Sequence, residues 1–161
     1  MKRITYLFVV LFAGLALYSG CKKEEGTSST PVVIDSANVS GNVEVNLSKI
    51  NDTVGIIYET VPAGTILHVK YNSKDLVTVP DNAITYGDVF MEIPVSAAGT
   101  YSFNVPVNLK TVAVSITSDD FEYLQVQADT TTERTIFTLP ATAINVTRGQ
   151  KQIVDLTFGV K

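Results

Sequence analysis

Few side chains in this 161-residue chain have the chemistry of a catalytic or metal-binding group. The chain has one cysteine, Cys21, one histidine, His68, and no tryptophan. A lone cysteine cannot form an intramolecular disulfide, and a single histidine cannot supply the several nitrogen or sulfur ligands of a zinc site. The thiol of Cys21 and the carboxylates of the 16 acidic residues are therefore the groups to consider first.

His68 lies in the alternating stretch TILHVKY, on the opposite face from Leu67 and Val69. Catalysis by a serine, histidine and aspartate triad would have to use this residue, but the chain has no Gly-x-Ser-x-Gly elbow. We expect His68 to be an exposed strand residue rather than a base or a metal ligand.

The densest acidic cluster consists of Asp119, Asp120 and Glu122. Calcium prefers carboxylate oxygens, but this spacing does not match the calcium loop of a helix-loop-helix site. A capped turn with solvated charges is the alternative that we favour. Asp81 and Asp88 form a weaker candidate pair.

Paired carboxylates can hydrolyse glycosides when a fixed distance separates them, but the sequence singles out no pair. Tyr58, Tyr71, Tyr86 and Tyr123 could stack on a sugar ring, although strand tyrosines more often pack against the core. We therefore predict that the protein is not an enzyme and has no cofactor and no metal.

The surroundings of Cys21 have the layout of a secretory signal peptide. Lys2 and Arg3 precede an uncharged apolar run at 4–17, which is too short for a comfortable membrane span. The small residue Gly20 stands directly before Cys21, and four charged residues follow it. We expect residues 1–20 to be removed by cleavage before Cys21.

LYSGC at 17–21 resembles the lipobox of bacterial lipoproteins, although Tyr18 stands where leucine is usual. In that family the cysteine sulfur carries diacylglycerol, so the resemblance implies acyl chains, such as palmitate, on Cys21. CKKEEG at 21–26 resembles the signal that follows this cysteine in surface-exposed lipoproteins of Bacteroidetes. The resemblance implies anchoring in the outer membrane and exposure at the cell surface; a plain hydrophilic tether is the alternative.

Removal of residues 1–20 would change the formal net charge from −4 to about −6, because Lys2 and Arg3 are lost. An acidic chain without a basic patch is unsuited to nucleic acid or anionic lipid, and we predict no nucleic-acid partner. The small polar stretch at 26–31 is typical of a flexible linker. We predict a lipidated tether at 21–37, with order beginning between 32 and 39, and a single domain at 38–161.

Alternation of apolar and polar residues predicts an all-β domain. In SGNVEVNLS, for example, Val43 and Val45 share one face and Glu44 lies on the other. Strands are expected over 39–48, 65–71, 88–95, 100–105, 111–117, 121–128, 133–139 and 150–158. We predict an antiparallel two-sheet sandwich of about seven to eight strands.

Two groups of residues test this sandwich directly. Tyr101, Phe103, Phe137 and Phe158 should be buried between the sheets, because their period-two neighbours are mostly apolar. Pro94 and Pro106 should lie on edge strands or at bulges, because proline lacks the N–H that a central strand needs.

Three stretches carry a family resemblance: PAGTILHVKYNSKDL, AAGTYSFNVPVNLKTVAVSITSDDF and VTRGQKQIVDLTFG. They resemble the transthyretin-like, or prealbumin-like, sandwich of carboxypeptidase-regulatory-type domains. The resemblance covers 39–159 and implies a spacer, an assembly module or a binding module. It brings no catalytic residue to this chain.

Three triplets begin at Asp35, Asp52 and Asp129. They resemble the acceptor of O-glycosylation in exported Bacteroidetes proteins, and the resemblance implies Thr53, Thr130 and Ser36 as acceptors. Chance matches in a threonine-rich chain are the alternative.

Taken together, these patterns predict a lipid-anchored, non-enzymatic domain of the cell envelope that displays a binding or assembly surface. A pilus or adhesin subunit is one alternative, and a glycan-binding accessory lipoprotein is another. The protein or glycan partner and the oligomeric state stay open.

Overall fold

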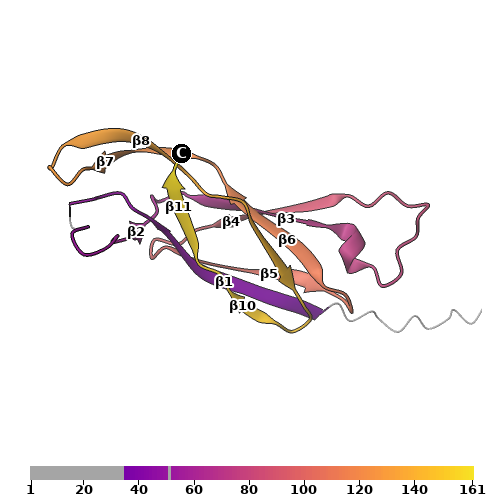
Figure 1. Ribbon diagram of the computed structural model, residues 1–161. Helices are drawn as coiled ribbons and strands as arrows, with labels where there is room; N and C mark the ends of the chain where they lie inside the picture. The colour runs from indigo at the N-terminus through magenta and orange to yellow at the C-terminus, as the bar shows by residue number, and fades with distance from the viewer. Residues whose placement is uncertain (1–34, 51) are drawn as a thin grey trace, which may run out of the picture. The chain divides into compact units, whose positions relative to one another are not determined.

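The computed structural model describes residues 35–50 and 52–161, so Cys21 and the predicted signal peptide lie outside the described residues. The described chain is all-β, with one short 3-10 helix (Figure 1). Its elements in order are β1 (Asp35–Val45), β2 (Glu59–Thr60), β3 (Ile66–Asn72), η1 (Ser73–Leu76), β4 (Asp88–Pro94), β5 (Thr100–Val107), β6 (Val112–Ser118), β7 (Phe121–Val126), β8 (Thr132–Thr138), β9 (Thr142–Val146), β10 (Lys151–Ile153) and β11 (Leu156–Val160).

The strands form two sheets. The smaller sheet has the order β4-β3-β6-β9 and is antiparallel throughout. The larger sheet has the order β10-β1-β11-β8-β7, and β2 and β5 also pair with β1. The long strand β1 thus has two partners on each side: β5 and β2 on one, and β10 and β11 on the other.

The pairing of β1 with the C-terminal strands is parallel, which corrects the prediction of a purely antiparallel sandwich. Asn38 to Ser40 pair with β10, and Val43 to Val45 pair with β11. The expected single strand at 150–158 is interrupted at Val154 and Asp155. The sequence pattern alone could not show this break, because Val154 keeps the apolar alternation.

Both sheets contribute to one core. From the larger sheet, Val39, Val43, Val105 and Leu156 are buried, and the smaller sheet adds residues such as Leu67, Val69 and Ile116. The prediction for the aromatic residues is confirmed, since all four are buried: Tyr101, Phe103, Phe137 and Phe158.

The proline prediction is also confirmed. Pro94 lies on β4, an edge strand of the smaller sheet, and Pro106 lies on β5, which pairs with β1 alone. Two strands, β2 and β9, were not predicted. β9 has only Ile144 and Val146 as large apolar residues, too few to mark a strand by alternation.

A close crossing of two backbone segments holds β1 against the C-terminal strands. A Cβ atom on Gly41 would lie 2.0 Å from the carbonyl oxygen of Val154, so only glycine fits at this position. The Val154 amide donates to the Ser40 carbonyl at 2.8 Å, and the Asn42 amide donates to Asp155 Oδ1 at 2.8 Å. The interruption between β10 and β11 therefore occurs where the Val154 carbonyl approaches Gly41.

Tyr101 completes this crossing from β5. Its hydroxyl donates to the Val154 carbonyl at 2.6 Å, and its ring is almost fully buried. Burial, with a smaller contribution from the Asp155 carboxylate, raises the pKa of Tyr101 from 10.0 to about 12. One phenol group thus connects β5 to the C-terminal strands.

Replacing this hydroxyl gives the first prediction. Tyr101→Phe should lower the free energy of unfolding by about 1–2 kcal/mol at pH 8, because the Val154 carbonyl loses its donor. In the unfolded chain the tyrosine ionises near pH 10.0, while in the folded chain it stays neutral until about pH 12. The free energy of unfolding of the wild type should therefore decrease as the pH rises from 10.0 to about 12. The difference in this free energy between the wild type and Tyr101→Phe should become smaller over the same range.

Urea unfolding of both proteins at pH 8 and at pH 11 measures this gap. A gap of the same size at both pH values would contradict the assigned role of the Tyr101 hydroxyl.

Candidate functional site

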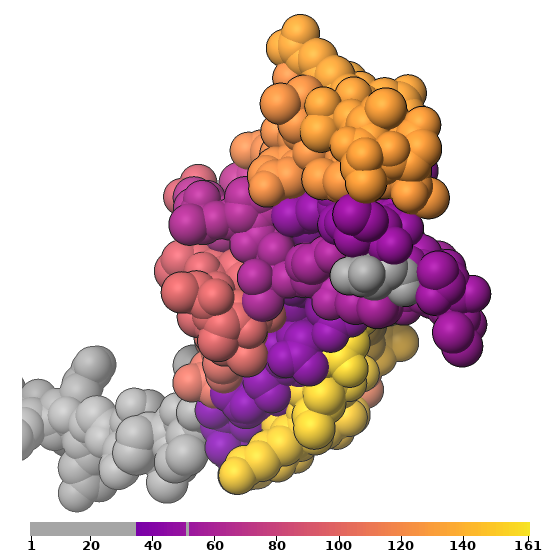
Figure 2. Space-filling model, turned by 90° about the vertical axis from the view of Figure 1, so that its left-hand side faces the viewer, coloured from indigo at the N-terminus to yellow at the C-terminus, as the bar shows by residue number. Residues whose placement is uncertain are grey.

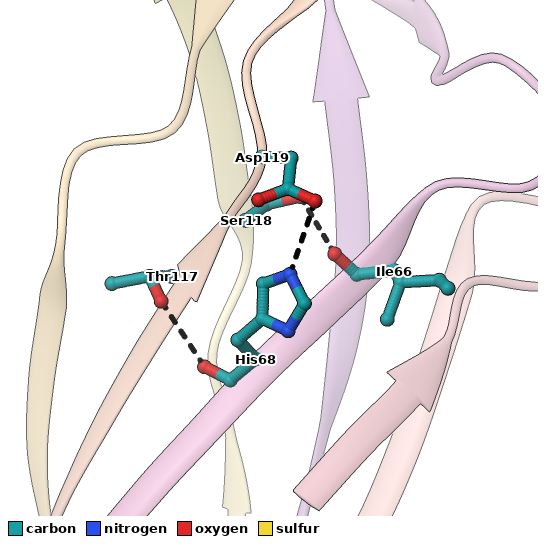
Figure 3. A network of polar contacts seen from close by, with 5 residues as sticks. All are labelled: Ile66, His68, Thr117, Ser118 and Asp119. Carbon is teal, nitrogen blue, oxygen red and sulfur yellow. Dashed lines mark hydrogen bonds and ion pairs between the residues drawn. The ribbon is translucent and has the colours of Figure 1, made fainter.

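His68 lies on the outer face of β3, as predicted, between the buried residues Leu67 and Val69. Its ring is half-buried rather than exposed: 35% of the side chain is accessible. Figure 3 shows the ring pointing toward Asp119, and Nε2 lies 3.4 Å from Asp119 Oδ2. The Asp119 side chain is 91% exposed, so solvent screens this pair.

The hydroxyl groups near His68 serve strand pairing. Ser118 Oγ donates to the Ile66 carbonyl at 2.7 Å, and Thr117 Oγ1 donates to the His68 carbonyl at 3.3 Å (Figure 3). Both bonds join the end of β6 to the backbone of β3. Among the described contacts, neither hydroxyl bonds to the imidazole ring, so the geometry shows no activated nucleophile.

The acidic cluster is divided among different partners. Asp120 Oδ2 accepts from Lys161 Nζ at 2.6 Å, and Glu122 accepts from Arg134. The hydrogen bond from Lys161 is the main reason that the pKa of Asp120 is lowered. Over residues 35–50 and 52–161, no three His, Cys, Asp or Glu side chains are grouped so that they could hold a metal ion.

The weaker pair of acids is also divided. Asp88 Oδ1 accepts from Asn72 Nδ2 at 2.9 Å, and its Oδ2 lies 3.7 Å from Lys70 Nζ. Asp81 instead accepts from the backbone amide of Ala83 at 2.8 Å, as in a capped turn.

The four candidate tyrosines do not share one role. Tyr71 is buried in the core, where burial raises its pKa, so it cannot stack on a ligand at the surface. The Tyr86 hydroxyl accepts from the Asp81 amide at 2.8 Å. Tyr58 and Tyr123 are exposed.

The three candidate acceptors for O-glycosylation are exposed but differ in backbone context. Thr53 lies in the turn region after Lys49, and Thr130 lies in the turn between β7 and β8 with a φ of 68°. Ser36 lies within β1, opposite Pro106 of β5. A modifying enzyme would reach the two turn residues more easily than a residue in a paired strand.

The most unusual surface was not predicted from the sequence. The segment between β1 and β2 exposes a set of large apolar side chains: Ile50, Val54, Ile56, Ile57 and Tyr58. We call these five residues the apolar tip. The run VGIIY, which has no charge and lies in a predicted loop, is the signal that could have identified it.

The Asp52 carboxylate holds the apolar tip in place. Its Oδ1 accepts from the Ile57 amide at 2.8 Å, and its Oδ2 accepts from Asn46 Nδ2 at 2.6 Å. These two bonds lower the pKa of Asp52. Glu59 Oε2 also accepts from the Leu47 amide at 2.8 Å, which ties the end of β1 to β2.

The base of the same segment is bound to the β7–β8 hairpin. The Lys49 amide donates to the Val126 carbonyl at 2.7 Å, and the Val126 amide donates to the Leu47 carbonyl at 3.0 Å. Gln125 is buried, and its Nε2 donates to the Asn46 carbonyl at 2.8 Å. Figure 2 shows this end of the domain, with the segment after β1 (purple) beside the hairpin (orange).

A second surface lies on the outer face of the smaller sheet. A shallow groove of about 290 Å³ has small residues, Ala113, Ser115 and Ala143, on its lining, and Lys70 and Asp88 also border it. Phe90, which pairs with Lys70 across β3 and β4, is 70% exposed.

Compared with known proteins, the chain matches no protein-family model and no curated protein sequence. In the described part of the chain, no helix has the length and apolar character that crossing a membrane requires.

The different surroundings of His68 and Phe137 give the second prediction. His68→Ala should change the free energy of unfolding by no more than about 0.5 kcal/mol, because its partner Asp119 is exposed. Phe137→Ala should lower it by about 3–5 kcal/mol, because a buried ring that stacks on Phe121 is lost.

Chemical denaturation of the two variants beside the wild type compares them. A loss above 2 kcal/mol for His68→Ala would mean that the outer face of β3 has a role that the observed contacts do not explain.

Proposed function

We propose that the protein is a lipid-anchored, non-enzymatic domain of the cell envelope, held through Cys21, which displays the apolar tip as a binding surface. The anchor rests on the sequence: a basic start, an apolar run and a small residue before Cys21. The binding surface rests on the structure. The observation that carries it is that the segment between β1 and β2 exposes five large apolar side chains, while the Asp52 carboxylate accepts hydrogen bonds from the Ile57 amide and the Asn46 side chain.

The position of the tip suits display away from an anchor. The chain enters the described domain at Asp35, the start of β1, and the tip follows the other end of the same strand. Eleven extended residues at about 3.3 Å each give β1 a length of about 35 Å. A partner that meets the tip therefore approaches the domain far from the point where the tether joins it.

The exposed large apolar side chains of the tip all fall within the nine residues from 50 to 58. Large apolar side chains that cluster at the surface mark sites of interaction, because their contact with water is unfavourable until a partner covers them. The hydrogen bond from the Ile57 amide to Asp52 also restrains this part of the segment before binding, which reduces the entropy that binding must overcome. Both features support a binding role more than a spacer role.

The resemblance to transthyretin-like domains is compatible with this proposal but is not the evidence for it. Such domains serve mostly as spacers, assembly modules or binders, and this chain has two sheets around one core. A polymerising subunit remains the alternative within the same class. β11 already has β1 on one side and β8 on the other within its own chain, so no observed gap in the sheet favours strand exchange.

Glycan binding is the second candidate, and the outer groove of the smaller sheet favours it. Its lining offers donors and acceptors from Lys70, Asn72 and Asp88, and the exposed ring of Phe90 stands on the same face. Such a combination of polar groups and an aromatic ring is suited to a sugar.

The third prediction tests two parts of the proposal together: the lipid anchor on Cys21 and the exposure of the apolar tip at the cell surface. An epitope inserted between Val54 and Gly55 should be labelled by antibody on intact cells, because both residues are exposed in the tip segment. The protein should fractionate with membranes. Cys21→Ala should abolish acylation and membrane association, since the acyl chains are the proposed anchor.

The control is the same epitope at the C-terminus, after Lys161, in the wild-type and Cys21→Ala backgrounds. Acyl chains on the Cys21→Ala protein would overturn the anchor. Labelling only after the cells are permeabilised would overturn display at the surface.

A further inference from the structure

A second set of exposed apolar side chains lies at the opposite end of the domain from the apolar tip. It consists of Val79, Ile84 and Leu109, and we call these three residues the tether-end patch. Val79 is 81% exposed and Leu109 is 72% exposed. Figure 1 shows the segment after η1 and the turn between β5 and β6 at the end where β1 begins, while β2 lies at the other end.

A side-chain hydrogen bond joins the two segments that form the patch. Asn108 Nδ2 in the turn after β5 donates to Thr78 Oγ1 in the segment after η1, at 2.9 Å. Leu109 follows Asn108 directly, and Val79 follows Thr78. The bond therefore connects the segments next to the positions where their apolar side chains are exposed.

The turn that carries Ile84 is restrained by its own hydrogen bonds. The Ile84 amide donates to the Asp81 carbonyl at 3.1 Å, and the Ala83 amide donates to Asp81 Oδ1 at 2.8 Å. The Asp81 amide in turn donates to the Tyr86 hydroxyl at 2.8 Å. Because these bonds restrain the turn before binding, less entropy is lost when a partner covers Ile84.

The patch lies where the chain leads to Cys21. In the pairing of β1 with β5, Asp35 lies opposite Val107, two residues before Leu109. Residues 22–34 separate Asp35 from Cys21, and a flexible linker of this length spans about 20 Å on average. Acyl chains on Cys21 would therefore hold this end of the domain close to the bilayer.

We propose that the tether-end patch docks on the surface of the same bilayer that holds the acyl chains of Cys21, with Val79, Ile84 and Leu109 in contact with lipid. The inference rests on the proposed anchor and adds an orientation: the domain stands on the patch, with the tip directed away from the bilayer. Attachment through Cys21 raises the effective concentration of the patch at the lipid surface. A contact of three side chains, too weak to hold a free domain, then suffices.

Apolar contact, rather than charge, drives this docking. Lys110 follows Leu109, but Asp81 lies between Val79 and Ile84, so the charges beside the patch have both signs. Such a mixed set gives little attraction to anionic lipid. Large apolar side chains gain free energy when they leave water and enter the boundary between headgroups and acyl chains. We therefore expect docking on a neutral phosphatidylcholine bilayer, with little dependence on salt.

The fourth prediction uses tryptophan as a probe, because the chain has none of its own. Leu109→Trp places the probe in the patch, and Val54→Trp places it in the tip, at another exposed position. Both full-length, acylated proteins are placed in phosphatidylcholine nanodiscs with or without bromine on the acyl chains, since bromine quenches tryptophan at close range. We expect the Leu109→Trp protein to lose emission intensity in the brominated nanodiscs and the Val54→Trp protein to keep it.

A second pair of variants separates docking from simple proximity to the bilayer. Ile84→Trp alone should be quenched by bromine. Ile84→Trp combined with Val79→Ser and Leu109→Ser keeps the tether and the probe but removes two apolar contacts, so it should lose most of this quenching. All three residues are exposed, and each variant should therefore have the same midpoint of thermal unfolding as the wild type, which shows that lost quenching is not lost folding.

Equal quenching of the Leu109→Trp and Val54→Trp proteins would overturn the proposal, and so would quenching that the serine substitutions do not reduce. A blue-shifted emission of the Leu109→Trp protein without quenching would mean that protein rather than lipid covers the patch, which also overturns it. The proposed anchor fails by a different readout, the mass of the acyl chains on Cys21. An acylated protein without quenching overturns the docking alone, whereas a protein without acyl chains overturns both proposals.

Discussion

The close contact between Gly41 and the carbonyl of Val154 is the constraint on which the larger sheet depends. In a parallel pair of strands, the first and last parts of the chain must meet at one fixed register, and no short turn sets that register. Here the absence of a side chain on Gly41 lets the backbone of Val154 approach β1 directly. Tyr101 then donates to the same carbonyl from β5, so three segments distant in sequence meet at one oxygen atom: β1, β5 and the link between β10 and β11.

The strand register at this crossing determines the path that the chain takes after the C-terminal end of β1. Because β11 pairs only with Val43 to Val45, β1 leaves it after that point and turns toward β7. The divergence leads the chain into the segment between β1 and β2, whose apolar side chains face solvent. The proposed binding surface is thus a consequence of strand pairing, and the carboxylate of Asp52 bonds to it at the Ile57 amide.

The sequence was sufficient where a residue's environment follows from its neighbours in the chain. Alternation placed Tyr101 and Phe103 in the core, and the missing N–H of proline placed Pro94 on an edge strand. It was insufficient where two distant segments meet. Nothing near Gly41 reveals that Val154 will cross it, and nothing near Asp120 reveals that Lys161 will bind it. For the same reason the acidic residues at 119–122 form a cluster in the sequence but have separate partners in the fold.

The free energy of unfolding of Gly41→Ala tests the importance of this crossing most directly. The added methyl group would meet a backbone carbonyl rather than a movable side chain, so strands must separate to accept it. We expect a loss of about 3 kcal/mol relative to the wild type, measured by chemical denaturation. Gly87→Ala is the control and should be nearly neutral, because its Cβ has open space. A Gly41→Ala protein as stable as the control would contradict the account.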